Sequence, residues 1–143
     1  MLTFRCGHCG SFTKAPVDQD SPPFPTCAIC AAPLDLEGRP QPTGEVELEM
    51  AIAAAPALVI VSYPGTSGHA LEHETAFRYL AGERVGRAVF LEAVDGEREE
   101  GPPGCLAFYR GAAVPLESGS EKSASDLLHW FERVQAAAQA SAA

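Results

Sequence analysis

The sequence predicts an α/β domain over residues 45–143, preceded by a small metal-binding module over residues 1–36. Patterns typical of buried strands and amphipathic helices follow one another along residues 57–134. Four of the five cysteines lie within the first 30 residues, as two C-x2-C pairs. Between these two parts, residues 37–44 read EGRPQPTG, and their prolines and glycines predict a linker.

Charge and hydropathy exclude two classes of partner. The chain of 143 residues has a formal net charge of −9. Neither the first 44 residues nor the remainder has the excess of lysine and arginine that binds nucleic-acid phosphates, so we expect no nucleic-acid partner. No apolar run reaches the roughly 18 residues of a membrane helix, and the N-terminus has no apolar signal core. We therefore expect a cytoplasmic protein without a membrane partner.

The cysteine spacing predicts a zinc ribbon. Cys6 and Cys9 are separated from Cys27 and Cys30 by 17 residues. Each C-x2-C turn directs two sulfurs toward one ion, and the gap suits a short hairpin. Four thiolate ligands leave no position for water, so the single Zn²⁺ would be structural. A module this small has too little core to fold without the metal. Two disulfides are the alternative, which the absence of any sign of an oxidising compartment disfavours.

The elements after the linker are predicted from periodicity and turn residues. Residues 46–55 are ambiguous, because apolar residues at every second position fit a strand whereas the alanines that follow favour a helix. The remaining elements are a buried strand over Leu58–Tyr63, a helix over His69–Glu83, strands over Arg87–Ala93 and Cys105–Tyr109, a hairpin turn at Arg110–Gly111, a returning strand over Ala113–Glu117, a helix capped by Ser123 or Ser125, and a fraying tail over Gln135–Ala143.

The stretch from Ala57 to Ala70, ALVIVSYPGTSGHA, resembles the active-site strand and helix start of thioredoxins. The segment PPGCLAFYRG resembles the family's cis-proline segment, with Pro103 at the cis-proline position. With the cysteine pairs in front, the whole chain is similar to the bacterial thioredoxins that carry an N-terminal zinc ribbon. The resemblance implies a thioredoxin fold, a central mixed sheet flanked by helices, and it favours a helix over residues 46–55.

The resemblance also implies that the redox site is lost. Thr66 and His69 match the two cysteines of the thioredoxin dithiol, and neither can form a mixed disulfide. Ile60 matches the buried aspartate that transfers protons in the family, and Pro102 lacks the N–H that would dock a substrate peptide. The segment before Pro103 is shorter than in the family, which predicts a loop instead of a helix. We therefore expect a redox-inactive protein that binds or regulates a protein partner.

The sequence leaves the roles of two other sites undecided. The alternative function is a thiol–disulfide oxidoreductase working through Cys105, which lies two residues after Pro103 but has no resolving cysteine. The simpler interpretation of Cys105 is a buried, inert thiol. His69 and His73, four residues apart on one helix face, have the spacing of metal ligands, but two histidines make a weak site and surface positions are the simpler expectation. Enzymatic activity is undecided, with a non-enzymatic role favoured.

Overall fold

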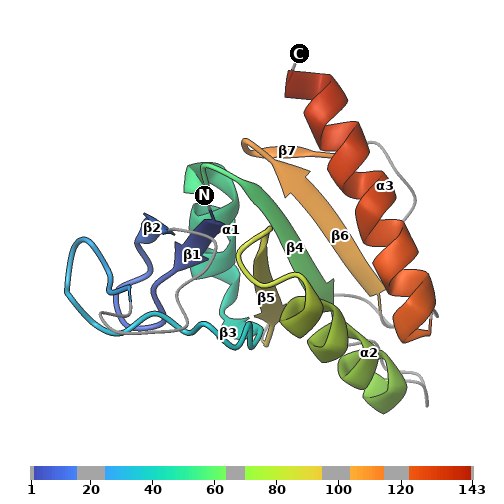
Figure 1. Ribbon diagram of the computed structural model, residues 1–143, viewed down its shortest axis with the longest axis horizontal. Coiled ribbons are helices and arrows are strands. Elements are labelled where there is room, and N and C mark those ends of the chain that lie inside the picture. The colour runs from blue at the N-terminus through green and yellow to red at the C-terminus, as the bar shows by residue number, and fades with distance from the viewer. Residues whose placement is uncertain (1, 16–24, 64–69, 95–103, 115–122, 143) are drawn as a thin grey trace.

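The computed structural model describes residues 2–15, 25–63, 70–94, 104–114 and 123–142. It has an N-terminal two-stranded sheet and a five-stranded mixed sheet with helices on both faces (Figure 1). The elements are β1 (Leu2–Arg5), β2 (Phe12–Ala15), β3 (Gln41–Thr43), α1 (Glu45–Ala54), β4 (Leu58–Tyr63), α2 (Ala70–Glu83), β5 (Val89–Ala93), β6 (Gly104–Tyr109), β7 (Ala112–Ala113) and α3 (Ala124–Ala142). No helix in these ranges is long and apolar enough to cross a membrane.

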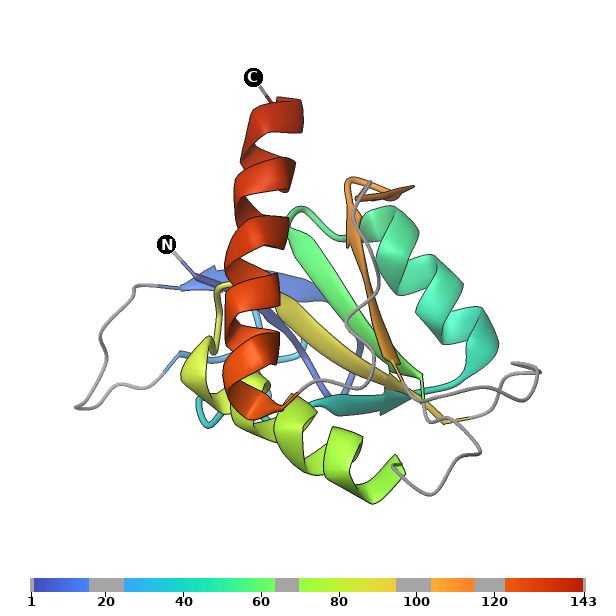
Figure 2. The same cartoon turned by 90° about the vertical axis from the view of Figure 1, so that its right-hand side faces the viewer.

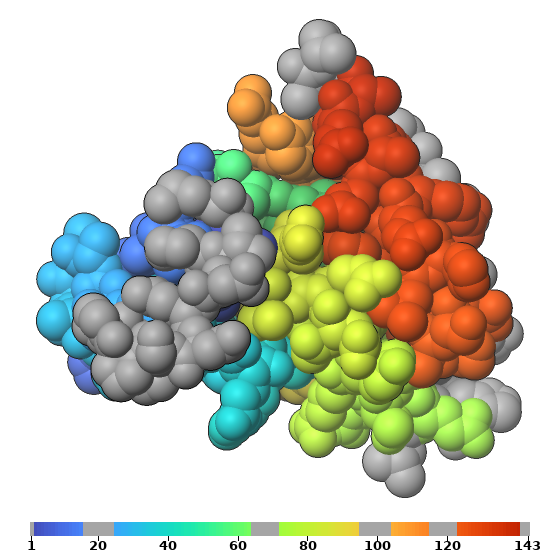
Figure 3. Space-filling model, viewed as in Figure 1, coloured from blue at the N-terminus to red at the C-terminus, as the bar shows by residue number. Residues whose placement is uncertain are grey.

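The large sheet has the strand order β3-β5-β4-β6-β7. Strand β5 pairs in parallel with both β3 and β4, whereas β6 is antiparallel to β4 and β7. Helix α1 covers one face, and α2 and α3 cover the other (Figure 2). Helices α2 and α3 lie side by side and form one continuous surface in the space-filling view (Figure 3). The predicted mixed sheet flanked by helices is therefore confirmed.

Strand β4 is central because its side chains are apolar in both directions. Leu58 and Ile60 belong to the core beneath α2 and α3, and Val59 and Val61 belong to the core beneath α1. Neither Ile60 nor Val61 has any exposed surface. This is the environment that a near-continuous apolar run predicts for a strand with both faces covered.

Helix α1 settles the ambiguity over residues 46–55. Leu48, Ala51 and Ala55 are buried against the sheet, at the spacing of one helix face. Val46 and Met50, which suggested strand alternation, are 70% and 65% exposed. The helix is therefore specified by the buried face of Leu48, Ala51 and Ala55, and it leaves two large apolar side chains on the surface.

The segment predicted as a linker contains a strand. Gln41–Thr43 form β3, which pairs in parallel with β5 and buries Thr43 almost completely. Pro42 hides this strand from sequence patterns, because proline cannot donate to a sheet ladder. An edge strand has one unpaired side, and there proline is tolerated.

The C-terminal elements are a tight hairpin and a last helix that is longer than expected. Arg110 and Gly111 have φ angles of 52° and 83°, the left-handed pair of a tight hairpin turn, as predicted. The returning strand β7 comprises Ala112–Ala113, and the part of the predicted strand Ala113–Glu117 beyond residue 114 lies outside the described residues. The Ser123 hydroxyl accepts a hydrogen bond from the Asp126 N–H at 3.2 Å, so Ser123 is the predicted cap. Helix α3 continues through the tail that was expected to fray, because Ala138 is buried in the core.

The N-terminal module, called the ribbon below (residues 2–15 and 25–36), is docked on the edge of the large sheet. Gln41 joins them by reciprocal hydrogen bonds: Arg5 Nη1 donates to its Oε1 at 2.8 Å, and its Nε2 donates to the Arg5 carbonyl at 2.6 Å. The Thr3 N–H donates to the Gly86 carbonyl at 2.9 Å, and Val85 packs against the ribbon core. The two parts are therefore joined by polar and apolar contacts.

Gly86 allows β1 of the ribbon to lie close to the turn after α2. Its φ angle is 77°, and a Cβ at this position would lie 2.5 Å from the Cβ of Leu2. A side chain here would be strained by the backbone and would push β1 away from the sheet. Glycine is thus required at the point where the ribbon meets the turn after α2.

Candidate metal centre and the site at the carboxyl end of β4

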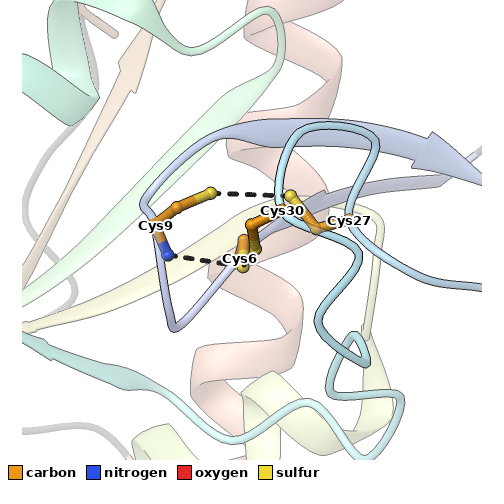
Figure 4. A group of neighbouring side chains, drawn as sticks. All are labelled: Cys6, Cys9, Cys27 and Cys30. Atoms are coloured by element: carbon orange, nitrogen blue, oxygen red, sulfur yellow. Dashed lines mark hydrogen bonds between the residues drawn. The ribbon is translucent and has the colours of Figure 1, made fainter.

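The structure brings together the sulfurs of Cys6, Cys9, Cys27 and Cys30, all within 4.8 Å of one another (Figure 4). The Cys6–Cys30 and Cys9–Cys27 sulfur distances are 3.6 Å and 3.5 Å. Tetrahedral zinc with Zn–S bonds of about 2.3 Å would require sulfurs about 3.8 Å apart. A disulfide bond is only about 2.05 Å long, and all four cysteines are free thiols. The geometry therefore fits one tetrahedral ion rather than two disulfides.

Two equivalent turns present these sulfurs. In the first cysteine turn (residues 6–10), the N–H groups of His8 and Cys9 donate to Cys6 Sγ at 3.4 Å and 3.5 Å. In the second cysteine turn (residues 27–31), the Ile29 N–H donates to Cys27 Sγ at 3.4 Å. Hydrogen bonds from backbone N–H groups stabilise thiolates more than thiols. His8 is exposed, as expected for a residue at the tip of the turn.

Two of the cysteines are shifted toward the thiolate form that binds metal. The backbone N–H groups of Cys30 and Ile29 lower the pKa of Cys27 to about 6. Hydrogen bonds from Ser11 lower the pKa of Cys9. These hydrogen bonds therefore favour the thiolate forms of Cys27 and Cys9.

The fourth cysteine shows why the cluster needs a cation. The backbone N–H of Ala32 lowers the pKa of Cys30, but burial and the hydrogen bonds with Cys6, Cys9 and Cys27 raise it overall to about 12. The chain alone thus does not stabilise four negative sulfurs in one place. A divalent ion would supply the missing charge, and four thiolates are the donor set of structural zinc sites.

The second candidate site lies at the carboxyl end of β4. Thr66, His69 and Pro103, the positions matched to the thioredoxin dithiol and cis-proline, lie outside the described residues, as does Pro102. Ile60, matched to the buried aspartate, is fully buried in the apolar core beneath α2 and α3. The described part of this site therefore offers no carboxylate at the Ile60 position.

A buried polar pair, which the sequence did not predict, lies two residues after Ile60 on β4. Ser62 Oγ and His73 Nε2 are 3.0 Å apart, and both residues are buried. The expectation that His73 is a surface residue is wrong. Its side chain is buried beneath α2, and its ring stacks on that of Phe77 with the ring centroids 6.2 Å apart. The spacing of His73, Phe77 and Leu80 places all three on the inner helix face and would have revealed this.

Cys105 lies beside this pair. It is the direct partner of Ser62 across the antiparallel β4–β6 ladder, so the two side chains are on the same face of the sheet. Cys105 has no exposed surface. A hydroxyl can accept a hydrogen bond from a thiol while donating to an imidazole. Cys105 and the Ser62–His73 pair therefore lie together on one face of the sheet, with the sulfur closed off from solvent.

Comparison with known proteins supports the fold. No protein-family model and no curated protein matches the chain. Among solved structures, it is similar to the crystal structure of chloroplastic thioredoxin z, with a TM-score of 0.58 and 21% sequence identity. That match covers 68% of this chain and 96% of the other. The large sheet and its helices therefore have a thioredoxin fold, preceded by a four-cysteine cluster consistent with a zinc ribbon.

The second cysteine turn contains a strained residue. Ala31 has a φ angle of 64°, where the first turn has Gly10 at 78°. The left-handed conformation costs a non-glycine residue about 1–2 kcal/mol. We predict that Ala31→Gly raises the free energy of unfolding of the metal-loaded protein by about 1 kcal/mol in urea titrations.

Two matched variants control this prediction. Gly10→Ala should lower stability, because the added Cβ would be strained and would lie 3.2 Å from Arg5 Nη2. Ala32→Gly, next to the strained position but with a negative φ, should lower stability by about 0.5–1 kcal/mol through backbone entropy. An Ala31→Gly protein no more stable than Ala32→Gly would contradict the claim that Ala31 is strained.

Proposed function

We propose that the chain is a redox-inactive thioredoxin-like protein, held together by one structural zinc ion, that binds or regulates another protein. The observation that carries this proposal is where the five cysteines lie. Four of five form the N-terminal cluster, and the fifth, Cys105, is fully buried. Thioredoxin catalysis needs an exposed thiolate at a helix start and a second thiol to resolve the mixed disulfide. Neither requirement is met by these five residues.

The zinc ribbon followed by a thioredoxin fold favours kinship with the bacterial thioredoxins that carry such a ribbon. The free thiols of the cluster favour a reducing compartment, so we place the protein in the cytoplasm. A binding role is consistent with the crystal structure of thioredoxin z, which is described as defining a type-specific target recognition. In this chain, the exposed Met50 of α1 is apolar surface that a partner protein would cover.

One zinc ion per chain is expected in protein purified without chelator. Cys9→Ser should lose it, because three thiolates no longer complete the tetrahedron. Cys105→Ser is the matched control and should retain the metal, since Cys105 lies on β6, outside the four-cysteine cluster. Elemental analysis by mass spectrometry measures both. Purified wild-type protein with no zinc and four oxidised cysteines would refute the metal centre.

The redox-inactive assignment is tested by insulin disulfide reduction with dithiothreitol as the electron donor. The wild-type protein should leave the rate at the level of dithiothreitol alone, while an ordinary thioredoxin added as a positive control accelerates it. The reason is that Thr66 stays protonated at neutral pH and His69 cannot form a mixed disulfide. Acceleration comparable to the positive control would overturn the assignment.

The second candidate function is thiol chemistry at Cys105, favoured by the Ser62–His73 pair beside it. In that case the Cys105 thiolate would attack a small disulfide, releasing one thiolate and leaving a mixed disulfide. A second small thiol would then have to break that bond, because the chain has no resolving cysteine near it. Accelerated reduction of a small disulfide by dithiothreitol that disappears in Cys105→Ser and falls in His73→Gln would promote this candidate.

A further inference from the structure

A groove of about 530 Å³ lies between the first cysteine turn and α1. The turn contributes Cys9 to one wall, and α1 contributes Glu47 and Met50 to the other. Phe12 of β2 lies between them. The volume of the groove is within the range of about 300–1,000 Å³ typical of ligand sites. The groove is therefore built jointly by the ribbon and the thioredoxin fold.

Both walls of the groove favour positive charge. Glu47 is exposed and is one of three glutamates on the first half of α1. On the opposite wall lies Cys9, an exposed member of the four-cysteine cluster, and four thiolates holding one divalent ion would carry a net charge of −2. Arg5 is the only arginine or lysine among the described lining residues, and its guanidinium donates to Gln41. An anionic ligand would be repelled from this groove.

The groove also needs an apolar occupant. Met50 is 65% exposed, and Phe12 is partly buried in the core beneath α1. Methionine is flexible and polarizable, which suits a surface that adapts to a partner's side chain. An aliphatic or aromatic group placed on Met50 and Phe12 would lie within reach of Glu47.

We propose that this groove binds a segment of a partner protein in which a lysine or arginine adjoins an aliphatic or aromatic side chain. The cation pairs with Glu47 and faces the thiolate cluster, while the apolar side chain covers Met50 and Phe12. The inference rests on the protein-binding function proposed above and gives it a location and a partner chemistry. Small cations such as polyamines would satisfy only the charged walls.

A random peptide library displayed on phage and selected on the full, zinc-loaded chain tests the proposal. Enriched peptides should share a basic residue beside an apolar one. The best peptide is then synthesised with a fluorescent label, and its dissociation constant is measured by anisotropy. Glu47→Lys should weaken binding at least tenfold. Glu49→Lys makes the same charge change on the same helix outside the groove lining, and should weaken binding less than threefold.

A second pair of variants tests the apolar part. Met50→Ala should weaken binding about fivefold, whereas Val46→Ala, equally exposed on α1 but outside the groove lining, should not. Equal losses in Glu47→Lys and Glu49→Lys would show unspecific charge attraction and overturn the groove. A selected peptide insensitive to both groove variants would overturn the groove and leave protein binding intact. Failure to enrich any peptide would overturn the groove and count against the binding function as well.

Discussion

The mutual repulsion of four sulfurs is the constraint on which the N-terminal part of the structure depends. All four lie within 4.8 Å of one another, a separation that thiolates keep only around a cation. The apolar core of the ribbon is small, so an ion bound by the cluster would supply much of its folding free energy. Once the first cysteine turn is fixed, β1 is fixed with it. Arg5 and Thr3 of β1 then reach Gln41 and Gly86 of the thioredoxin fold.

This docking explains how β3 can be a strand at all. Three residues with a proline at the centre form a weak edge, and such an edge needs protection from unwanted pairing. The hydrogen bonds of Gln41 to Arg5 anchor its first residue to the ribbon, and Thr43 is buried at its last. The same contacts create the groove beside α1, whose two walls belong to different parts of the chain. Metal, edge strand and groove are in this way parts of one arrangement.

Features that depend on local sequence patterns could be predicted. The apolar run of β4 predicted a central strand, and the C-x2-C spacing predicted which four sulfurs would meet. Long-range packing hid β3: Gln41–Thr43 looked like a linker because the ribbon and β5 that hold them lie far along the chain. The burial of His73 was instead a missed local signal, because its helical spacing from Phe77 and Leu80 already placed it on the inner face. The roles of Thr66, His69 and Pro103 stay predictions, since these residues lie outside the described ranges.

The central claim is that the metal cluster organises the sheet edge as well as the ribbon. Hydrogen–deuterium exchange of the full chain, with and without a zinc chelator, tests it most directly. Chelation should speed exchange in the ribbon and also in β3 and at Val94, whose N–H donates to the Thr43 carbonyl. Helix α3, which packs in the core on the opposite face, should be unaffected. An increase confined to the ribbon, with β3 and Val94 unchanged, would contradict the account.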